Sequence, residues 1–278
     1  MRLMEGKTTV ITGPTSGIGK EIAKGLAALG STLVLGCRDT AAGTALAQEL
    51  HLASKSSVDV VHVDVSSRQS VQVFAQNVLE RHKKLHVVVN NAAVSRGPQP
   101  LFKSPDGIEL TFATNVLGYF FILQALLPRL QESAPARIIN VASTFASDLD
   151  LEDLQFQHRP YDGMKAYAQS KACDRMLTWA LARRLDGSGV TANAMAPGLI
   201  VDTGLYRHAP PEVVAQLRKR GGGRTPSDGA DTAIWLSSSP DIQEVTGKFF
   251  ENRDEIPCSF RNRENEERLW TICETLSR

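Results

Sequence analysis

The sequence has few cysteines and no excess of charge of either sign. Its 278 residues include only Cys37, Cys173, Cys258 and Cys273, which are widely scattered and have no histidines beside them at zinc-ligand spacing. Disulfide-stabilised domains and structural zinc proteins are therefore excluded, and we expect no metal site. The 31 basic and 30 acidic side chains leave a net charge of +1. Nucleic-acid-binding proteins usually carry a strongly basic face, so we expect no nucleic acid as a partner.

Long apolar runs are also missing. The richest run, Val116 to Leu127, is interrupted by Gln124. It is shorter than the roughly 18 residues that indicate a membrane-spanning helix, so we predict a buried helix there. Residues 1–7 lack the apolar core of a secretory signal. We therefore expect a cytoplasmic protein without a membrane anchor.

What the sequence contains is a regular alternation of short β-branched runs with amphipathic segments of helical length. Strands are predicted at 8–12, 32–37, 58–65, 85–90, 137–142, 191–196 and 248–250. Helices are predicted at 17–29, 41–52, 67–81, 107–132, 162–185 and 228–238. Strand-helix alternation with nearly continuous apolar strands is typical of a parallel sheet covered on both faces. We predict one α/β domain over residues 1–278, with a doubly wound parallel sheet of about seven strands and helices on both faces.

A segment rich in proline and glycine follows the sixth predicted strand. It contains Pro210, Pro211 and three consecutive glycines at 221–223. Ligands of open α/β sheets bind outside the carboxyl ends of the strands, so we predict a substrate lid around 199–224. Its apolar residues could instead form an ordinary packing helix. The basic cluster 218–220 is interpreted as a solvated loop rather than a phosphate-binding patch.

A glycine-rich turn stands directly after the first strand. Gly13, Gly17 and Gly19 flank Thr15, Ser16 and Ile18 and open the first helix. Glycines at such a turn let a helix N-terminus approach a pyrophosphate without a Cβ in the way. Three glycines can also form a plain turn, but the strand before them and the helix after them favour a dinucleotide site.

The end of the second strand suggests which dinucleotide binds. A carboxylate at the last strand residue would hold the ribose hydroxyls of NAD, but Cys37 stands there and Arg38 follows. A guanidinium can pair with a 2′-phosphate, which favours NADP(H), whereas Asp39 keeps NAD(H) open as the alternative. After the third strand, Asp64 and Val65 are placed to contact adenine, with a local turn as the alternative for Asp64.

Two Tyr-x-x-x-Lys pairs occur in the chain. Asp162 is predicted as a helix N-cap, which leaves Tyr161 outside the helix that contains Lys165. Tyr167 and Lys171 both fall within that helix, one turn apart on the same face. There an ammonium can stabilise a phenolate and lower the tyrosine pKa. We therefore predict Tyr167 and Lys171 as the catalytic pair.

Two further polar residues lie near this predicted pair. Ser143 follows the fifth strand, where its hydroxyl can reach a carbonyl oxygen at the edge of the sheet. Asn115 lies in an otherwise apolar helix. An internal asparagine needs a specific partner, so Asn115 is a candidate anchor for a water relay.

These motifs, in this order, resemble the short-chain dehydrogenase/reductase family. Besides the glycine turn, Asn115, Ser143, Tyr167 and Lys171, the resemblance rests on residues 90–93 (Asn-Asn-Ala-Ala) and on Pro197-Gly198. Within the family the chain is most similar to the retinol-dehydrogenase-like branch, which includes the protochlorophyllide reductases. The supporting stretches are 36–39, 162–167 and 267–270. The resemblance implies a Rossmann fold.

The resemblance also implies roles for individual residues. Tyr167 would be the general acid in reduction and the base in oxidation, Ser143 would hold the substrate oxygen, and Asn115 would support a proton relay. Lys171 would tune Tyr167 and bind the nicotinamide ribose. The remaining cofactor contacts would come from Asn91, Ala92, Pro197, Gly198, Ile200 and Thr203, with one extra residue before Thr203 compared with the usual pattern.

We therefore expect an NADPH-dependent oxidoreductase that reduces a ketone or aldehyde on a bulky lipophilic substrate by hydride transfer. A tailoring step of secondary metabolism would suit such a site. The alternatives are NADP+-dependent oxidation of a retinol-like or steroid-like alcohol, and a non-catalytic NADP(H)-binding sensor. By family resemblance, the helices at 107–132 and 162–185 would pair across the axis of a homodimer; the alternative is that their apolar residues face only the sheet.

Overall fold

The computed structural model describes residues 2–97, 100–207, 209–220 and 224–277. Within these ranges, an eight-stranded sheet has the order β3-β2-β1-β4-β5-β6-β7-β8. The strands are β1 (Thr8–Thr12), β2 (Thr32–Cys37), β3 (Val58–His62), β4 (Val87–Asn90), β5 (Ala136–Val141), β6 (Val190–Ala196), β7 (Phe249–Glu251) and β8 (Asp254–Glu255). β1 to β7 run parallel, and β8 pairs antiparallel with β7. The predicted Rossmann-type sheet is confirmed, with one short edge strand added.

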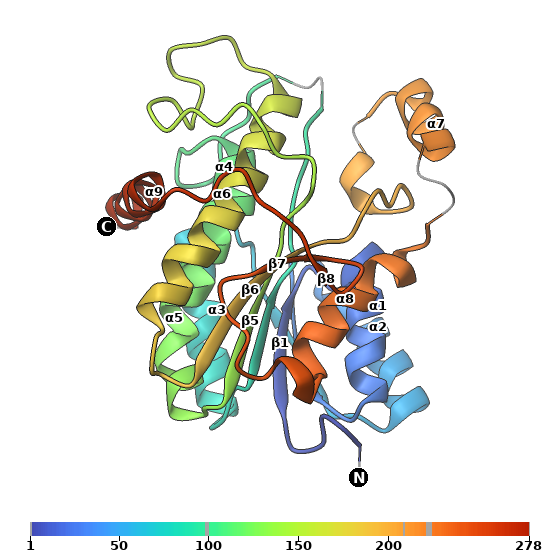
Figure 1. The fold of residues 1–278 in the computed structure, drawn as a ribbon. Helices are drawn as coiled ribbons and strands as arrows, with labels where there is room; N and C mark the ends of the chain where they lie inside the picture. The colour runs from blue at the N-terminus through green and yellow to red at the C-terminus, as the bar shows by residue number, and fades with distance from the viewer. Residues whose placement is uncertain (1, 98–99, 208, 221–223, 278) are drawn as a thin grey trace.

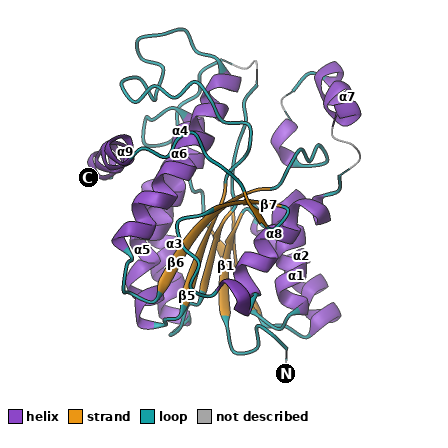
Figure 2. Cartoon of the chain, in the orientation of Figure 1, coloured by secondary structure: helices purple, strands orange, loops and turns teal. Residues whose placement is uncertain are grey.

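Helices cover both faces of this sheet (Figures 1 and 2). One layer contains α1 (Gly17–Ala28), α2 (Thr40–Ser54) and α8 (Pro226–Ser238), and the other contains α3 (Arg68–Arg81), α5 (Gly118–Glu132) and α6 (Gly163–Arg184). Successive strand residues point to opposite faces, so Val10 and Val34 join one core cluster while Ile11 and Leu35 join the other. The strand order reverses between β1 and β4, which is where ligands bind in such sheets.

Strand ends differ from the predicted ones where a side chain closes a turn. β1 and β2 have the predicted bounds, but β3 ends at His62 rather than at residue 65. The Asp64 carboxylate accepts the backbone N–H of Ser66 at 3.0 Å and its hydroxyl proton at 2.7 Å. This turn takes the chain away from the sheet before the apolar pattern ends.

The helix predicted at 107–132 begins later and is not uniform. Glu109 caps α4 (Leu110–Phe112) by accepting two backbone N–H groups, a π-helical turn η1 (Ala113–Leu117) follows, and α5 continues to Glu132. The continuous helix Leu110–Glu132 is long and apolar enough to cross a membrane, but 78% of its most apolar window is buried inside the protein. The expectation of a buried helix there agrees with this packing.

Two further helices are present, of which the first was predicted only as the alternative to a lid and the second was not predicted. α7 (Pro211–Arg220) places the basic cluster 218–220 in its last turn, so the interpretation of that cluster as a loop was wrong. Residues 208 and 221–223 of the predicted lid lie outside the described residues. α9 (Arg263–Leu276) packs against α6 and buries Leu269 and Cys273 (Figure 1).

Candidate active site

Tyr167 and Lys171 lie in the first part of α6, as predicted. The Asp162 side chain accepts the backbone N–H groups of Met164 and Lys165 and so begins the helix at Gly163. Tyr161 therefore lies outside α6, and its hydroxyl donates to the Glu109 carboxylate at 3.2 Å. Of the two Tyr-x-x-x-Lys pairs, only the second has both members on one helix.

Tyr167 is buried beneath an aromatic side chain. Phe145, which is itself half exposed, stacks on the Tyr167 ring at a centroid distance of 6.3 Å and an interplanar angle of 20°. Burial raises the pKa of the Tyr167 phenol well above its usual value, while a hydrogen bond with the Ser143 side chain acts in the opposite direction. Without a ligand, the phenol is therefore a protonated group close to the Ser143 hydroxyl.

The Lys171 ammonium lies at the carboxyl end of β5. It donates to the Val141 carbonyl oxygen at 2.9 Å and to Asp174 Oδ2 at 2.7 Å. It lies 5.9 Å from the centre of the Tyr167 ring. The expectation that Lys171 lowers the pKa of Tyr167 does not match this arrangement, because the negative charge of Asp174 balances the ammonium and itself raises the pKa of Tyr167.

Asn115 lies in the π-helical turn η1 and is fully buried. Its Oδ1 accepts the backbone N–H of Val94 at 2.8 Å, and its Nδ2 donates to the Val94 carbonyl at 3.0 Å and to the Ser170 hydroxyl at 2.9 Å. Asn115 thus joins the segment after β4 to α6, which carries Tyr167. Its part in a water relay stays a prediction.

The glycine turn is packed too tightly for side chains. A Cβ on Gly13, whose φ is +66°, would lie 2.9 Å from the Ala92 Cα. A Cβ on Gly19 would lie 2.3 Å from the Gly13 carbonyl oxygen and 2.4 Å from Asn91 Nδ2. Asn91 holds the turn by donating to the carbonyls of Thr12 and Gly13 at 2.9 and 3.0 Å. Asn91 and Ala92 therefore pack against the glycine turn and hold its backbone in place.

The turn leaves the N-terminus of α1 open to a ligand. The N-cap Ser16 makes no side-chain capping bond, so the first N–H groups of this 12-residue helix have no side-chain acceptor there. A pocket of about 370 Å³ opens at this point, lined by Ser16, Gly17, Val201, Asp202, Thr203, Gly204, Tyr206, Arg207, Val214 and Arg218. The helix N-terminus and the Arg207 guanidinium suit an anionic dinucleotide, whereas Arg218 is paired with the Asp202 carboxylate at 2.9 Å.

The residues predicted to contact the nucleoside end of the cofactor lie directly after β2 and after β3. Arg38 is exposed just beyond β2. The Asp39 carboxylate caps α2 by accepting the Ala42 N–H at 2.9 Å. Asp64 Oδ1 accepts both hydrogen bonds of the local turn with Ser66, the alternative predicted for this residue, and its contact with adenine stays a prediction. Val65 is buried, and its carbonyl oxygen would lie 2.7 Å from a Cβ on Gly118.

The stretch after β6 reaches the other end of the cofactor site. A Cβ on Gly17 would lie 3.1 Å from the Thr203 Cβ, so Thr203 is beside the glycine turn despite the extra residue before it. Ile200 is buried over Gly229 of α8, next to Ile18. Gly198 has a φ of +75°, and the Arg224 guanidinium lies against it.

Several side chains at this site were not singled out from the sequence. Asp174 pairs with Lys171, and the Arg175 guanidinium donates to the Ser143 carbonyl and lies 4.1 Å over the Phe249 ring. Tyr206 is close enough to Tyr167 that burial, together with that phenol, raises the pKa of Tyr206 to about 12. The position of Asp174 three residues after Lys171 was a usable signal. Arg175 and Tyr206 depend on tertiary contacts.

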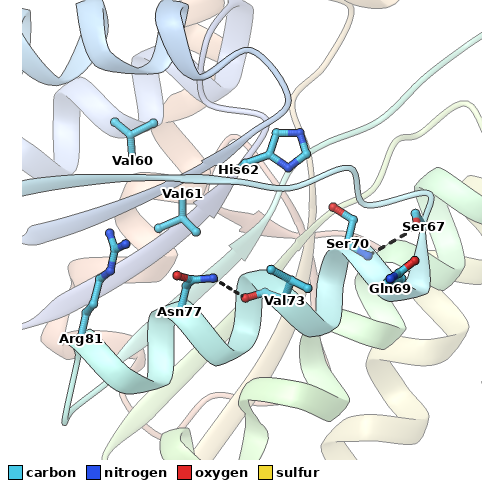
Figure 3. A pocket seen from close by; sticks show the side chains of 9 residues that line it. All are labelled: Val60, Val61, His62, Ser67, Gln69, Ser70, Val73, Asn77 and Arg81. Atoms are coloured by element: carbon cyan, nitrogen blue, oxygen red, sulfur yellow. Dashed lines mark hydrogen bonds between the residues drawn. The ribbon is translucent and has the colours of Figure 1, made fainter.

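A second pocket, of about 460 Å³, lies between the edge strand β3 and α3 (Figure 3). It is lined by Val60, Val61, His62, Ser67, Gln69, Ser70, Val73, Asn77 and Arg81. No predicted site residue is among them. This pocket is therefore separate from the candidate active site.

Comparisons with known proteins agree with this geometry. The sequence matches the short chain dehydrogenase family over residues 7–212. Retinol dehydrogenase 12 from Mus musculus is 37% identical over 277 residues, covering 98% of this chain and 86% of that protein. The Pseudomonas aeruginosa RhlG/NADP active-site complex superposes with a TM-score of 0.71 and 28% identity, covering 90% of this chain and 96% of that chain.

A third similar protein carries the other nicotinamide cofactor. The 3-ketoacyl-(acyl-carrier-protein) reductase from Brucella melitensis complexed with NADH has a TM-score of 0.71 and 27% identity, and it covers 88% of this chain and 96% of that chain. The chain belongs to the short-chain dehydrogenases, a family of oxidoreductases with nicotinamide cofactors, and within it to the branch that resembles the retinol dehydrogenases.

Proposed function

We propose that this enzyme uses NADPH to reduce the carbonyl group of a bulky lipophilic aldehyde or ketone. The observation that carries the proposal is the buried Tyr167 phenol, which shares a hydrogen bond with Ser143 and lies under Phe145. A phenol is protonated at neutral pH, and burial disfavours its anion, so Tyr167 holds the proton that a carbonyl oxygen would receive. That state suits reduction, in which the carbonyl oxygen must receive a proton.

Ser143, Tyr167 and the neighbouring side chains have separate roles in the proposed reaction. The Ser143 hydroxyl holds the substrate oxygen, and Tyr167 gives that oxygen its proton as negative charge develops. Phe145 and Tyr206 lie near the phenol and provide aromatic surface, which suits a lipophilic substrate. Pro197 and Gly198 would help to hold the nicotinamide, which would supply or accept the hydride.

The proposed preference for NADPH rests on the positions of Arg38 and Asp39 at the end of β2. The Asp39 carboxylate caps α2 through Oδ1, which holds it at the start of that helix. Arg38 is exposed at the end of β2 and carries the charge that a 2′-phosphate needs. Thr15, Ser16, Gly17 and Ile18 would hold the pyrophosphate at the start of α1.

The enzyme would act as one domain over residues 1–278, with α7 as part of a lid. α9 covers α6, and Trp270 packs edge-on against Phe120 at 4.9 Å. This packing disfavours a homodimer through α5 and α6, so we propose that the enzyme acts as a monomer. Sedimentation of the full chain tests this: a dimer at micromolar concentration would contradict it.

The proposed reaction is tested with purified protein, NADPH and a panel of carbonyl compounds that includes all-trans-retinal, by following the loss of reduced nicotinamide absorbance. We expect turnover of at least one lipophilic aldehyde or ketone. Cofactor binding without turnover of any compound would favour the sensor alternative.

The reverse reaction is the second candidate, because the relatives are named retinol dehydrogenases. Incubation with NADP+ and all-trans-retinol tests it. Faster oxidation than reduction at neutral pH would favour that direction over the one that we propose.

A further inference from the structure

Lys171 and Asp174 form an ion pair that is sealed from solvent. The Nζ–Oδ2 distance is 2.7 Å, and the two side chains are 2% and 0% exposed. The residues are three positions apart on α6, so they share a face of the helix. Tyr167 lies on the same face, one turn before Lys171. The pair therefore belongs to the interior of the candidate active site.

The groups around Asp174 offer it no second partner. Asp174 Oδ1 is buried and accepts no hydrogen bond within the part of the chain that the structure describes. Arg175, next in sequence, directs its guanidinium to the Ser143 carbonyl and the Phe249 ring. The other titratable groups that face Asp174 are Tyr119 of α5, Cys173 and Tyr167 of α6, and Cys273 of α9. Lys171 is thus the group to which Asp174 is bonded.

Lys171, in turn, depends on Asp174 for its charge. Burial alone favours the neutral form of a lysine, often by several pKa units. Here the carboxylate opposes burial, and the pKa of Lys171 is raised rather than lowered. Burial raises the pKa of Asp174 to about 6, which still leaves it ionised at neutral pH. The neutral-pH state of the pair is therefore ammonium with carboxylate.

The geometry also fixes where the ammonium can act. An ammonium has three protons to donate. Val141 and Asp174 accept two of them, at 2.9 and 2.7 Å, and the Tyr119 hydroxyl lies within hydrogen-bonding reach of the ammonium. A displaced Lys171 would lose this orientation toward the end of β5, where the family resemblance places the nicotinamide ribose.

We propose that Asp174 is a positioning residue that keeps Lys171 protonated and oriented for the reaction. This inference rests on the proposed function for its catalytic consequence, but the charge state of Lys171 can be tested in the protein without cofactor or substrate.

The first test compares Asp174→Asn with the wild type by thermal unfolding of the cofactor-free protein between about pH 7 and pH 9.5. In the variant, the pKa of Lys171 falls because a carboxylate at position 174 no longer opposes the effect of burial. Between that lowered value and the ordinary lysine value, the unfolded state binds more protons than the folded state, so stability rises with pH. We expect the loss of melting temperature in the variant to shrink by roughly half over this range.

The second test is the pH dependence of kcat/KM for reduction of the best carbonyl substrate. The alkaline limb should move to lower pH by roughly one unit in Asp174→Asn, because Lys171 loses its charge earlier or Tyr167 ionises earlier. Asp174→Glu, which keeps a carboxylate, should recover part of the shift. Asp231→Asn makes the same chemical change in an exposed ion pair with Arg253 and should leave the profile unchanged.

The outcomes of these tests distinguish the role inferred for Asp174 from the proposed carbonyl reduction. If Asp174→Asn loses the same stability at every pH and keeps the wild-type alkaline limb, the inference is wrong while the proposed function stands. If Asp174→Asn does not fold, the double variant Lys171→Met/Asp174→Asn should fold, because the uncompensated cation is gone. An unfolded double variant would overturn the inference. Failure of the proposed reaction itself would leave the cofactor-free test intact.

Discussion

The carboxylate of Asp39 accepts the backbone N–H of Ala42 at 2.9 Å through Oδ1 and so caps helix α2. An aspartate beside the end of the second strand could suggest a preference for NAD. The capping bond holds this carboxylate at the start of α2, and Arg38, the preceding residue, is the exposed basic group at this place.

Arg38→Ala should therefore weaken NADPH binding far more than NADH binding. Loss of a charge-assisted contact to a phosphate costs about 1.5 to 3 kcal/mol, so we expect a roughly ten- to hundredfold rise in the Kd for NADPH. Titration of cofactor fluorescence measures both constants. Lys83→Ala, which removes an exposed cation before β4, serves as the control and should change neither. Equal losses for both cofactors would show that Arg38 does not read the 2′-phosphate.

Gly13→Ala should reduce both stability and cofactor affinity. Gly13 and Gly187 both have positive φ, +66° and +72°, so alanine is strained at either position. Only at Gly13 would the new Cβ approach backbone, at 2.9 Å from the Ala92 Cα, whereas nothing lies within 4 Å at Gly187.

Gly187→Ala should therefore cost about 1 kcal/mol of unfolding free energy and leave NADPH affinity unchanged. Gly13→Ala should cost more and weaken NADPH binding at least about tenfold, because the turn must open. Urea denaturation and cofactor titration measure the two effects. Indistinguishable variants would contradict the tight packing at the turn.

His86 should make stability depend on pH in mildly acidic solution. Its Nδ1 accepts the Thr8 N–H at 3.0 Å, and burial, with smaller contributions from Lys7 and Lys84, lowers its pKa to about 4. As the pH falls below the ordinary histidine value of about 6.5, the unfolded state takes up a proton that the folded state refuses. The free energy of unfolding should therefore fall between these two pH values.

His86→Gln tests the assignment, since an amide oxygen can accept the same N–H without binding a proton. Urea midpoints of the wild type and the variant should converge as the pH is lowered through this window. A constant difference between the two proteins would mean that His86 does not titrate in this way.

The layered fold could be predicted because each strand and helix carries its own pattern. The run at β1 is β-branched throughout, and Gly17 and Asp162 mark helix starts through backbone requirements that are local in sequence. The Tyr167 and Lys171 pair was visible for the same reason, since helical spacing alone places both on one face.

Other features depend on contacts between distant segments. α9 is a strongly charged segment, and its buried Leu269 and Cys273 have meaning only once α6 is in place. Asp174 was not singled out from the sequence, although its spacing from Lys171 was visible, and the burial of the pair follows only from the fold. The contact of Asn115 with Val94 likewise joins segments that only the fold brings together.

The most direct test of the account is the rate of NADPH-dependent carbonyl reduction by Tyr167→Phe, measured beside the wild type. Phenylalanine keeps the ring under Phe145 and removes the one proton that the reaction is proposed to use. We expect kcat to fall by about a hundred- to ten-thousandfold, with NADPH affinity nearly unchanged. A variant that turns over as fast as the wild type would contradict the proposed chemistry.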